Sequence, residues 1–370
     1  MKIMNLIFGL ILLTACSDNK TNYTVEEVNG IKVYKNTNTP AKPDLKINLQ
    51  ELFSIKSFDE SFADDSARVI QDMSSIAVDS EDNIFILSSN KATVFKFNSN
   101  GSFIKSFGRM GDGPGESKWP QNMYIQNDTV HVLNQTVLRM NKYDTDGKFL
   151  FSVSTGDCKM PIYTKPLGND RIVTYFCNWR YENNGMFMDY DLGIADAKYN
   201  EVKRIKMQTF EGERVQSGYI DPFFGFAVTE KEVFVADNSV EKYHIDVFDH
   251  NGELLYSIKK PFRKLRASKS MTEASKGNVI FKKAVTDLLT DSDGRLWAFV
   301  STERIDENEN DFIVDIFKDG VYLNRVKIDI GVNTEPDWMY GQIFIKRDRL
   351  YVSDPDNSVL KVFQYQVYDG

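Results

Sequence analysis

The sequence is short of the residues that many metal and disulfide proteins need. It has only three His and three Cys in 370 residues, too few for zinc-finger spacing or for a small domain held together by disulfides. Basic residues are not in excess, because 45 Lys plus Arg stand against 53 Asp plus Glu and give a formal net charge of −8. That balance disfavours general nucleic-acid binding.

The sequence also lacks the local signatures of common catalysts. No segment has the Gly-x-Ser-x-Gly turn of a hydrolase nucleophile. The Gly-rich residues 108–115 are not followed by the Lys and Ser or Thr of a phosphate-binding loop. We therefore expect no catalytic residues. The remaining composition, 42% hydrophobic and 13% aromatic, is typical of a globular protein with a large core.

The one long apolar run lies at the N-terminus. Residues 1–15 are interpreted as a signal peptide, with Lys2 before an apolar stretch at 6–13 that is too short to span a bilayer. The LTAC ending at Cys16 resembles a bacterial lipobox and predicts lipidation of that Cys, a plain cleaved signal being the alternative. The polar residues 16–44 are expected to form a lipidated flexible tether.

The rest of the chain repeats one pattern six times. An apolar run, a tight polar turn and a second run are followed by a variable loop, a third run and usually a Gly-bearing turn into a fourth. The first turns lie at residues 81–83, 127–128, 169–170, 231–232, 293–294 and 347–348. Their spacing approaches the size of a four-stranded propeller blade, about 40 to 50 residues plus insertions. The pattern predicts an all-β, six-bladed β-propeller over residues 45–370, with a β-sandwich or two small barrels as the alternative.

The last repeat is one strand short, because the chain ends at Gly370 where other units make their second turn. The apolar residues 45–55 precede the first unit and are expected to supply that strand. The ring would then be closed by an N-terminal strand completing the last blade, which protects the sheet edges.

One phrase points to a known family. The stretch FNSNGSFIKSFGRMGDGPGE at residues 97–116 resembles the NHL-like, TolB-like six-bladed propeller lipoproteins of Bacteroidetes. The resemblance implies an outer-membrane lipoprotein of the cell envelope and no defined activity. Lipoproteins of this type often reach the cell surface through an acidic stretch after the lipidated Cys, but here only Asp18 is acidic at that position. Periplasmic and surface exposure both stay open.

Loop lengths indicate which face of the ring carries function. First-to-second and third-to-fourth turns share one face and are short, whereas the opposite face receives longer connections, at residues 108–120, 177–186, 208–222, 259–284, 301–311 and 331–340. Long ordered loops in a compact domain are often functional. We call the two sides the short-turn face and the long-loop face.

The long loops hold aromatic and polar residues suited to stacking on sugars or gripping a peptide near the central channel. The candidate ligand-binding residues are Arg68, Arg109, Trp119, Asn178, Trp179, Arg180, Tyr219, Phe223, Trp338 and Tyr340. The alternative is that these aromatics plug the channel mouth or pack between blades.

Residues 259–284 form a basic excursion with nine Lys or Arg against one Glu and a partly helical composition. Such a segment suits an anionic glycan, phospholipid headgroups or a partner. A solvated, mobile helix without a ligand is the alternative.

Metal and thiol chemistry is only weakly indicated. His131, His244 and His250 are not expected to converge on one metal. Calcium is the metal left open, because Asp237 and Asn238, and residues 354–357, place oxygen donors where a second strand meets the long-loop face. Such Asp and Asn clusters more often form turns, which is the alternative. A disulfide between Cys158 and Cys177 and two separate thiols are both compatible with their positions near loop ends.

These observations predict a lipid-anchored propeller of the cell envelope that binds a glycan, peptide or envelope protein on its long-loop face. Contact with the membrane is expected through the lipid anchor only, with no nucleic acid and no required cofactor. A calcium-dependent propeller enzyme, such as a lactonase-like hydrolase or a lyase, is one alternative. A scaffold inside an envelope complex is the other.

Overall fold

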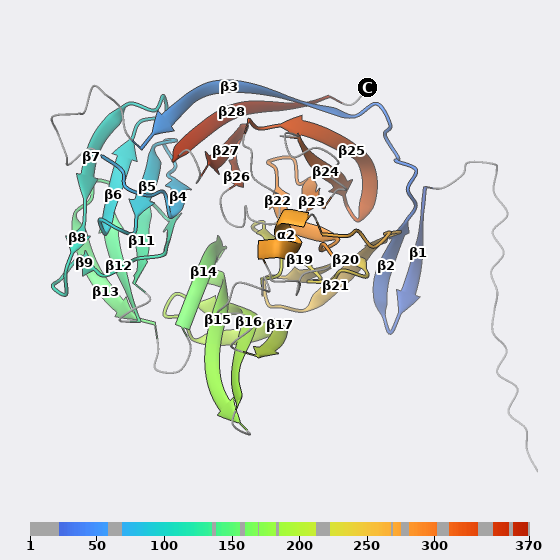
Figure 1. Ribbon diagram of the computed structural model, residues 1–370, viewed down its shortest axis with the longest axis horizontal. Coiled ribbons are helices and arrows are strands. Elements are labelled where there is room, and N and C mark those ends of the chain that lie inside the picture. Colours follow the sequence, from blue (N-terminus) through green and yellow to red (C-terminus); the bar gives the residue numbers. More distant parts are fainter. Residues whose placement is uncertain are drawn as a thin grey trace, which may run out of the picture.

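Six β-sheets arranged as blades of a ring form the main body of the chain in the computed structural model (Figure 1). The structure describes residues 22–57, 69–134, 138–155, 160–168, 170–182, 185–211, 223–267, 269–274, 281–301, 311–331, 343–354 and 358–368. The predicted all-β, six-bladed propeller is confirmed.

Each blade contains four strands in antiparallel order, and the first strand of each lies innermost, beside the first strands of neighbouring blades. Blade 1 has β4 (Ser75–Val78), β5 (Ile84–Ser88), β6 (Thr93–Phe97) and β7 (Phe103–Phe107), and blade 2 has β10 (Asn122–Gln126), β11 (Thr129–Asn134), β12 (Arg139–Asp144) and β13 (Phe149–Ser154). Blade 3 has β14 (Met160–Leu167), β15 (Arg171–Glu182), β16 (Gly185–Asp196) and β17 (Glu201–Glu211), and blade 4 has β18 (Phe226–Val228), β19 (Glu232–Ala236), β20 (Tyr243–Asp249) and β21 (Leu254–Lys260). Blade 5 has β22 (Val285–Thr290), β23 (Leu296–Val300), β24 (Asp311–Lys318) and β25 (Val321–Asp329), and blade 6 has β26 (Ile343–Lys346), β27 (Arg349–Asp354), β28 (Val359–Tyr368) and β3 (Lys46–Lys56).

The turn residues explain why the strands pair as they do. Asn127 and Asp128 both have φ near +50° between β10 and β11, as a tight hairpin turn of the primed type requires. Gly101 has φ +82° between β6 and β7, and a Cβ there would lie 2.6 Å from the ring of Phe53 on blade 6. Glycine is therefore needed both for the turn and for the close approach of the two blades.

The core lies between the blades, because each middle strand presents alternate residues to two neighbours. On β5, Ile84 and Ile86 pack in a cluster with Leu360 of blade 6, whereas Phe85 packs in a cluster with Val130 of blade 2. All of these side chains are buried. The alternate residues of one strand therefore fill the interfaces on the two sides of its blade.

The ring is closed as expected. Strand β3 pairs antiparallel with β28 from Lys46↔Tyr368 to Lys56↔Val359, which completes blade 6 with residues from the start of the chain. The seam between blades 6 and 1 carries two further ties, since Arg347 donates to Ser80 O (2.8 Å) and Arg349 donates to Ser99 O (2.6 Å).

The expected flexible tether over residues 16–44 is corrected from residue 23 onward. Strands β1 (Tyr23–Val28) and β2 (Ile31–Asn36) form a hairpin, and β2 pairs in parallel with β21. Blade 4 therefore has six strands. The hairpin covers the outer edge of blade 4 (Figure 1), and such edges need cover in sheet proteins. Residues 16–21 lie outside the described part.

One long connection differs from the loop expected, and another contains the helical structure that its composition indicated. Residues 177–182 continue strand β15, and β16 begins at Gly185, so the segment 177–186 is mostly a β-hairpin. The basic excursion contains the short helix α2 (Lys269–Ala274). No helix in the described ranges is both long enough and apolar enough to cross a membrane.

Candidate ligand-binding surfaces

The most prominent feature of the long-loop face is the β15–β16 hairpin. Both strands have 12 residues, against five in β5 and β19, so their far ends extend beyond the blade. The hairpin projects away from the ring (Figure 1). Asn178, Trp179 and Arg180 were expected in a loop at the central channel, but they lie instead on this projecting hairpin.

One side of the hairpin is aromatic and rich in Met. Because directly paired residues share a side, Trp179 and Met188 lie on the same side as Tyr181 and its partner Met186. Trp179 is 41% exposed and Tyr181 is 78% exposed. At the base, Met188 is buried in a small cluster with Cys177 and Tyr190. We call Trp179, Tyr181, Met186 and Met188 the aromatic strip.

The other side of the hairpin is polar and held by charge pairs. Arg180 Nε donates to Asp189 Oδ2 at 2.7 Å, and its NH1 lies 2.6 Å from Glu182 Oε2. Its guanidinium also lies over the Phe187 ring at 5.1 Å. Burial alone would raise the pKa of Asp189, but hydrogen bonds from Arg180 and Thr209 outweigh it and lower that pKa. These contacts link β15, β16 and β17 on the polar side of the hairpin.

Arg109 and Trp119 lie in a different part of the molecule, between blades 1 and 2. Arg109 belongs to β8 (Arg109–Met110), which pairs in parallel with β9 (Glu116–Ser117). Its side chain is 80% exposed and contacts Glu116 at 2.6 Å. The Gly113 amide and Arg109 lower the pKa of Glu116. Trp119 is 52% exposed. The Gly-rich phrase is thus an ordered, charge-paired connection, separate from the blade 3 hairpin.

The other candidates divide into a packed residue and residues outside the described ranges. Phe223 packs edge-on against Tyr175 (5.1 Å) and Tyr190 (5.5 Å), which supports the packing interpretation for this aromatic. The remaining calls lie outside the described residues: Arg68, Tyr219, Trp338, Tyr340, Cys16 and Cys158.

Cys177 lies inside strand β15, not near a loop end as expected, and it is buried. Burial raises the pKa of its thiol to about 11, which disfavours the reactive thiolate. Its bridge to Cys158 stays a prediction.

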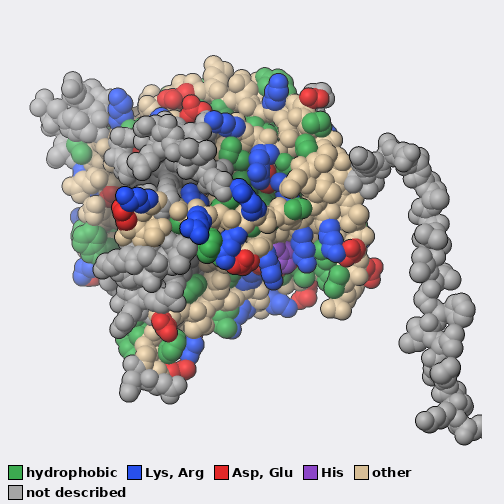
Figure 2. All heavy atoms as spheres, turned by 45° about the vertical axis from the view of Figure 1, so that its right-hand side comes forward, with side chains coloured by type: hydrophobic (Ala, Val, Ile, Leu, Met, Phe, Trp, Pro, Cys, Tyr) green, Lys and Arg blue, Asp and Glu red, His purple; other side chains and the backbone are tan. Residues whose placement is uncertain are grey.

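The basic excursion is tied to the blades at both ends. Lys260 is buried, with its Nζ 3.1 Å from Asp315 Oδ2 and 4.0 Å from the Tyr322 ring centroid. Near the other end, Ala284 N donates to Ser239 O of blade 4 at 2.9 Å. Within the excursion, Phe281 forms an isolated bridge with Arg266 and lies under Lys264 Nζ at 3.9 Å. These contacts disfavour a wholly mobile helix. In Figure 2, which brings the side carrying β1 and β2 forward, Lys and Arg side chains gather across the middle of the face.

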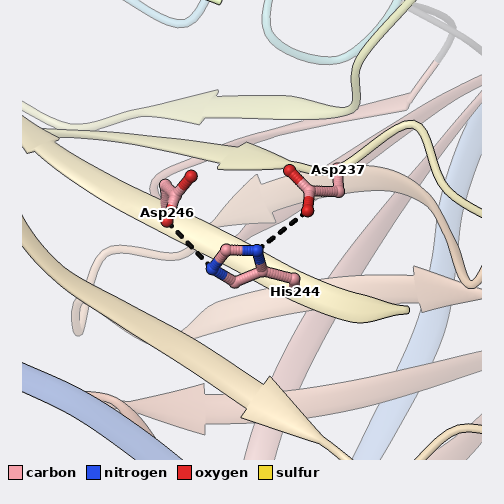
Figure 3. A group of neighbouring side chains, drawn as sticks. All are labelled: Asp237, His244 and Asp246. Atoms are coloured by element: carbon pink, nitrogen blue, oxygen red, sulfur yellow. Dashed lines mark hydrogen bonds and ion pairs between the residues drawn. The ribbon is translucent and has the colours of Figure 1, made fainter. Parts of the chain in front are cut away.

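A charged network joins Lys206 of blade 3 to blade 4 near the long-loop face. Figure 3 shows its blade 4 members, Asp237, His244 and Asp246. His244 on β20 has Nδ1 2.8 Å from Asp237 Oδ2 and Nε2 3.0 Å from Asp246 Oδ1. Lys206 of β17 contacts both carboxylates, at 3.0 Å for Asp246. Ser257 also donates to Asp246, at 2.6 Å. Two cations and two anions are therefore paired in one half-buried cluster.

The protonation of this network follows from its geometry. Burial alone would lower the pKa of His244, but the adjoining Asp237 and Asp246 carboxylates outweigh it and raise the pKa to about 9. Burial alone would raise the pKa of both carboxyl groups, but His244 and Lys206 lower it. The imidazole is then a cation at neutral pH.

Asp237, His244 and Asp246 offer three ligand atoms within 4.8 Å of one another, a spacing that suits a metal ion. A protonated imidazole does not bind a metal, however, and Lys206 already supplies positive charge to both carboxylates. Asn238, the neighbouring expected calcium ligand, donates to Gln208 at 3.0 Å. The cluster fits a resident metal poorly and fits an inter-blade ion pair well.

A cavity of about 800 Å³ lies around the ring axis on the short-turn face, where no site was expected. It is lined by the first-to-second turns of five blades: Gln126 and Asn127 of blade 2, Leu167 and Asp170 of blade 3, Thr229 and Glu230 of blade 4, Asp291 and Ser292 of blade 5, and Lys346 and Arg347 of blade 6. Loop length could not indicate this site, because its lining turns are short.

Fold and sequence together place the chain in a class, the six-bladed β-propellers. A family model described as a 6-bladed beta-propeller, DUF5128, matches residues 36–223, slightly more than half of the chain. The chain belongs to this family.

Solved structures with similar folds include two from Bacteroides species. A predicted exported protein of Bacteroides fragilis matches with a TM-score of 0.53 and 11% identity, covering 91% of this chain and 99% of that one. A DUF4221 family member from Bacteroides vulgatus matches with a TM-score of 0.51 and 11% identity, covering 88% and 99%. These likenesses concern the fold alone. No functionally curated protein matches the chain.

Virginiamycin B lyase from Staphylococcus aureus matches more distantly, with a TM-score of 0.44 and 9% identity, covering 87% of this chain and 99% of that one. This similarity does not bear on activity.

Proposed function

We propose that this propeller is a lipid-anchored binding protein of the cell envelope, and that the aromatic strip of the β15–β16 hairpin contacts its glycan, peptide or protein partner. The observation that carries the proposal is the exposure of Trp179 and Tyr181 on an element that projects from the ring. Exposed aromatic side chains are enriched where proteins bind partners. A projecting strip suits the surface of a peptide or protein better than a small molecule, which favours a concave site.

Two further features support the proposal. Charge pairs around Arg180 hold the polar side of the hairpin, so little conformational entropy is lost when a partner binds. The signal-like N-terminus with its LTAC ending, together with the exported description of a protein of similar fold, supports an outer-membrane envelope location and lipidation at Cys16.

Photocrosslinking in cells tests the contact directly. A photoreactive amino acid replaces Tyr181 in one strain and Phe151 in a second, because Phe151 is an aromatic of blade 2 that is also exposed, at 53%. We expect a discrete crosslinked product from position 181 only, lost when Trp179→Ala is added. Equal products from both positions, or none from position 181, would contradict the proposal.

A calcium-dependent enzyme is the second candidate. It is supported by the neighbouring carboxylates of Asp237 and Asp246, which offer oxygen ligands. Calcium binding there would have to displace Lys206 and His244 from their oxygens. Isothermal titration of the purified chain with CaCl₂ distinguishes the calcium-dependent enzyme from the binding protein. Tight binding that Asp246→Asn abolishes would favour the enzyme, whereas no binding at millimolar calcium would remove it.

A further inference from the structure

We propose that the axial cavity on the short-turn face binds a small molecule with both an ammonium and a carboxylate group, such as a short peptide with free ends. The cavity has about 800 Å³, within the range of small-molecule sites, roughly 300 to 1,000 Å³. It lies on the face opposite the long connections. The inference is therefore independent of the proposed partner contact on the blade 3 hairpin.

The charged residues of the cavity are separated by sign. Asp170 and Glu230 come from blades 3 and 4, whereas Lys346 and Arg347 come from blade 6. In a six-bladed ring, blades 3 and 6 stand on opposite sides of the axis. One wall therefore attracts a cation and the opposite wall an anion, the arrangement that a zwitterion complements.

Not every charged group of the cavity is available to a ligand. Asp291 is committed to the fold, because its Oδ2 accepts from Trp297 Nε1 at 3.1 Å and contacts Arg295 at 3.1 Å. Arg347 is committed to the seam with blade 1, where it contacts Asp82 and donates to Ser80 O at 2.8 Å.

Glu230 and Lys346 differ from these committed groups. Both residues are exposed, and neither side chain has a hydrogen bond or ion pair with any other residue in the described part of the chain. Asp170 accepts one bond from Asn127 Nδ2, at 3.3 Å, through a single oxygen. Lys346 is thus the group for a ligand carboxylate, and Glu230, with Asp170 beside it, is the group for a ligand ammonium.

Neutral lining residues set the rest of the specificity. Pro166, Val228 and Ile345 supply apolar surface. Thr229 and Ser292 supply hydroxyl groups. The apolar surface suits small aliphatic side chains between the two charged ends. A peptide of two or three small residues matches this distribution better than a sugar, which would leave the charged walls without partners.

Isothermal titration with trialanine and its end-blocked forms tests the proposal on the purified chain. We expect trialanine to bind, and either N-acetylation or C-terminal amidation to weaken binding about threefold to fivefold, as for exposed ion pairs. Lys346→Gln should abolish the preference for the free carboxylate and leave the preference for the free amine. Glu230→Gln should do the reverse. Lys231→Gln is the matched control, since Lys231 is an exposed neighbour of Glu230 outside the cavity lining.

Two results would overturn the inference. One is no binding of trialanine at millimolar concentration. The other is binding to which end-blocking and both cavity variants make no difference. Trp179→Ala, which tests the hairpin contact, is expected to leave trialanine binding unchanged, so the two proposals fail separately.

Discussion

At the scale of single residues, His244 links the ion-pair network to the pH dependence of stability. Its pKa of about 9 in the folded chain lies above the ordinary value of 6.5. The protonated imidazole therefore stabilises the fold fully below pH 6.5, and this contribution is lost as the pH rises through 9. The shift corresponds to at most about 3 kcal/mol. We expect the difference in unfolding free energy between the wild type and His244→Gln to fall by about this amount between pH 6.5 and 10. Urea titration at each pH measures it.

His250 supplies the matched control, because it lies on the turn after β20 outside the network. His250→Gln should show no such pH dependence relative to the wild type. A difference between wild type and His244→Gln that stays constant over this range would mean that His244 is not held as a cation. The network was not predictable from the sequence, because Lys206 comes from another blade and 31 residues separate it from Asp237.

At the scale of elements, the N-terminal hairpin joins two blades through one buried side chain. Asn36 donates to Gly320 O at 3.0 Å and accepts from the Tyr322 amide at 2.8 Å, which ties β2 to blade 5. Asn36→Ala leaves both backbone groups without this partner, so we expect a loss of about 1 to 3 kcal/mol in unfolding free energy. Glu27→Ala, on the exposed strand β1, should change stability by less than about 0.5 kcal/mol. Equal effects of the two variants in urea titration would show that the hairpin is not part of the cooperative fold.

Element prediction succeeded where turn chemistry and alternation agree and failed where they do not. Strand β1, YTVEEV, is almost wholly exposed and lacks an apolar face, so its sequence resembles a linker. Strand β1 pairs with β2, and β2 in turn pairs with β21, which is more than 200 residues away and is brought to the hairpin only by the folded chain. The extension of β15 did have a signal, since the NNG ending at Gly185 is a turn sequence between two alternating runs. The charged residues of the segment, such as Arg180 and Glu182, made its sequence resemble a loop.

At the scale of the whole molecule, repetition made the ring predictable but left the cavity hidden. Six similar turns on one face indicate six blades, and a missing last strand indicates closure by residues 45–55, as β3 confirms. The axial cavity has no local signal, because Glu230 and Lys346 are ordinary turn residues in sequence. They face one site only because the ring carries turns from separate blades to the same axis.

Closure also predicts that the ring unfolds as one unit. Ile55 of β3 is buried opposite Leu360, in a cluster that includes Ile84 of blade 1, so it stabilises both sides of the seam. Ile55→Ala should cost about 2 to 4 kcal/mol. If the blades support one another, the slowest amides of β11 and β23 should exchange hydrogen at least about 30-fold faster in Ile55→Ala than in the wild type. This is expected although both strands lie outside blade 6. Leu52→Ala, at an exposed position of the same strand, should leave these rates unchanged. Faster exchange confined to blade 6 would show instead that the last blade opens alone and that the other five stay folded without closure.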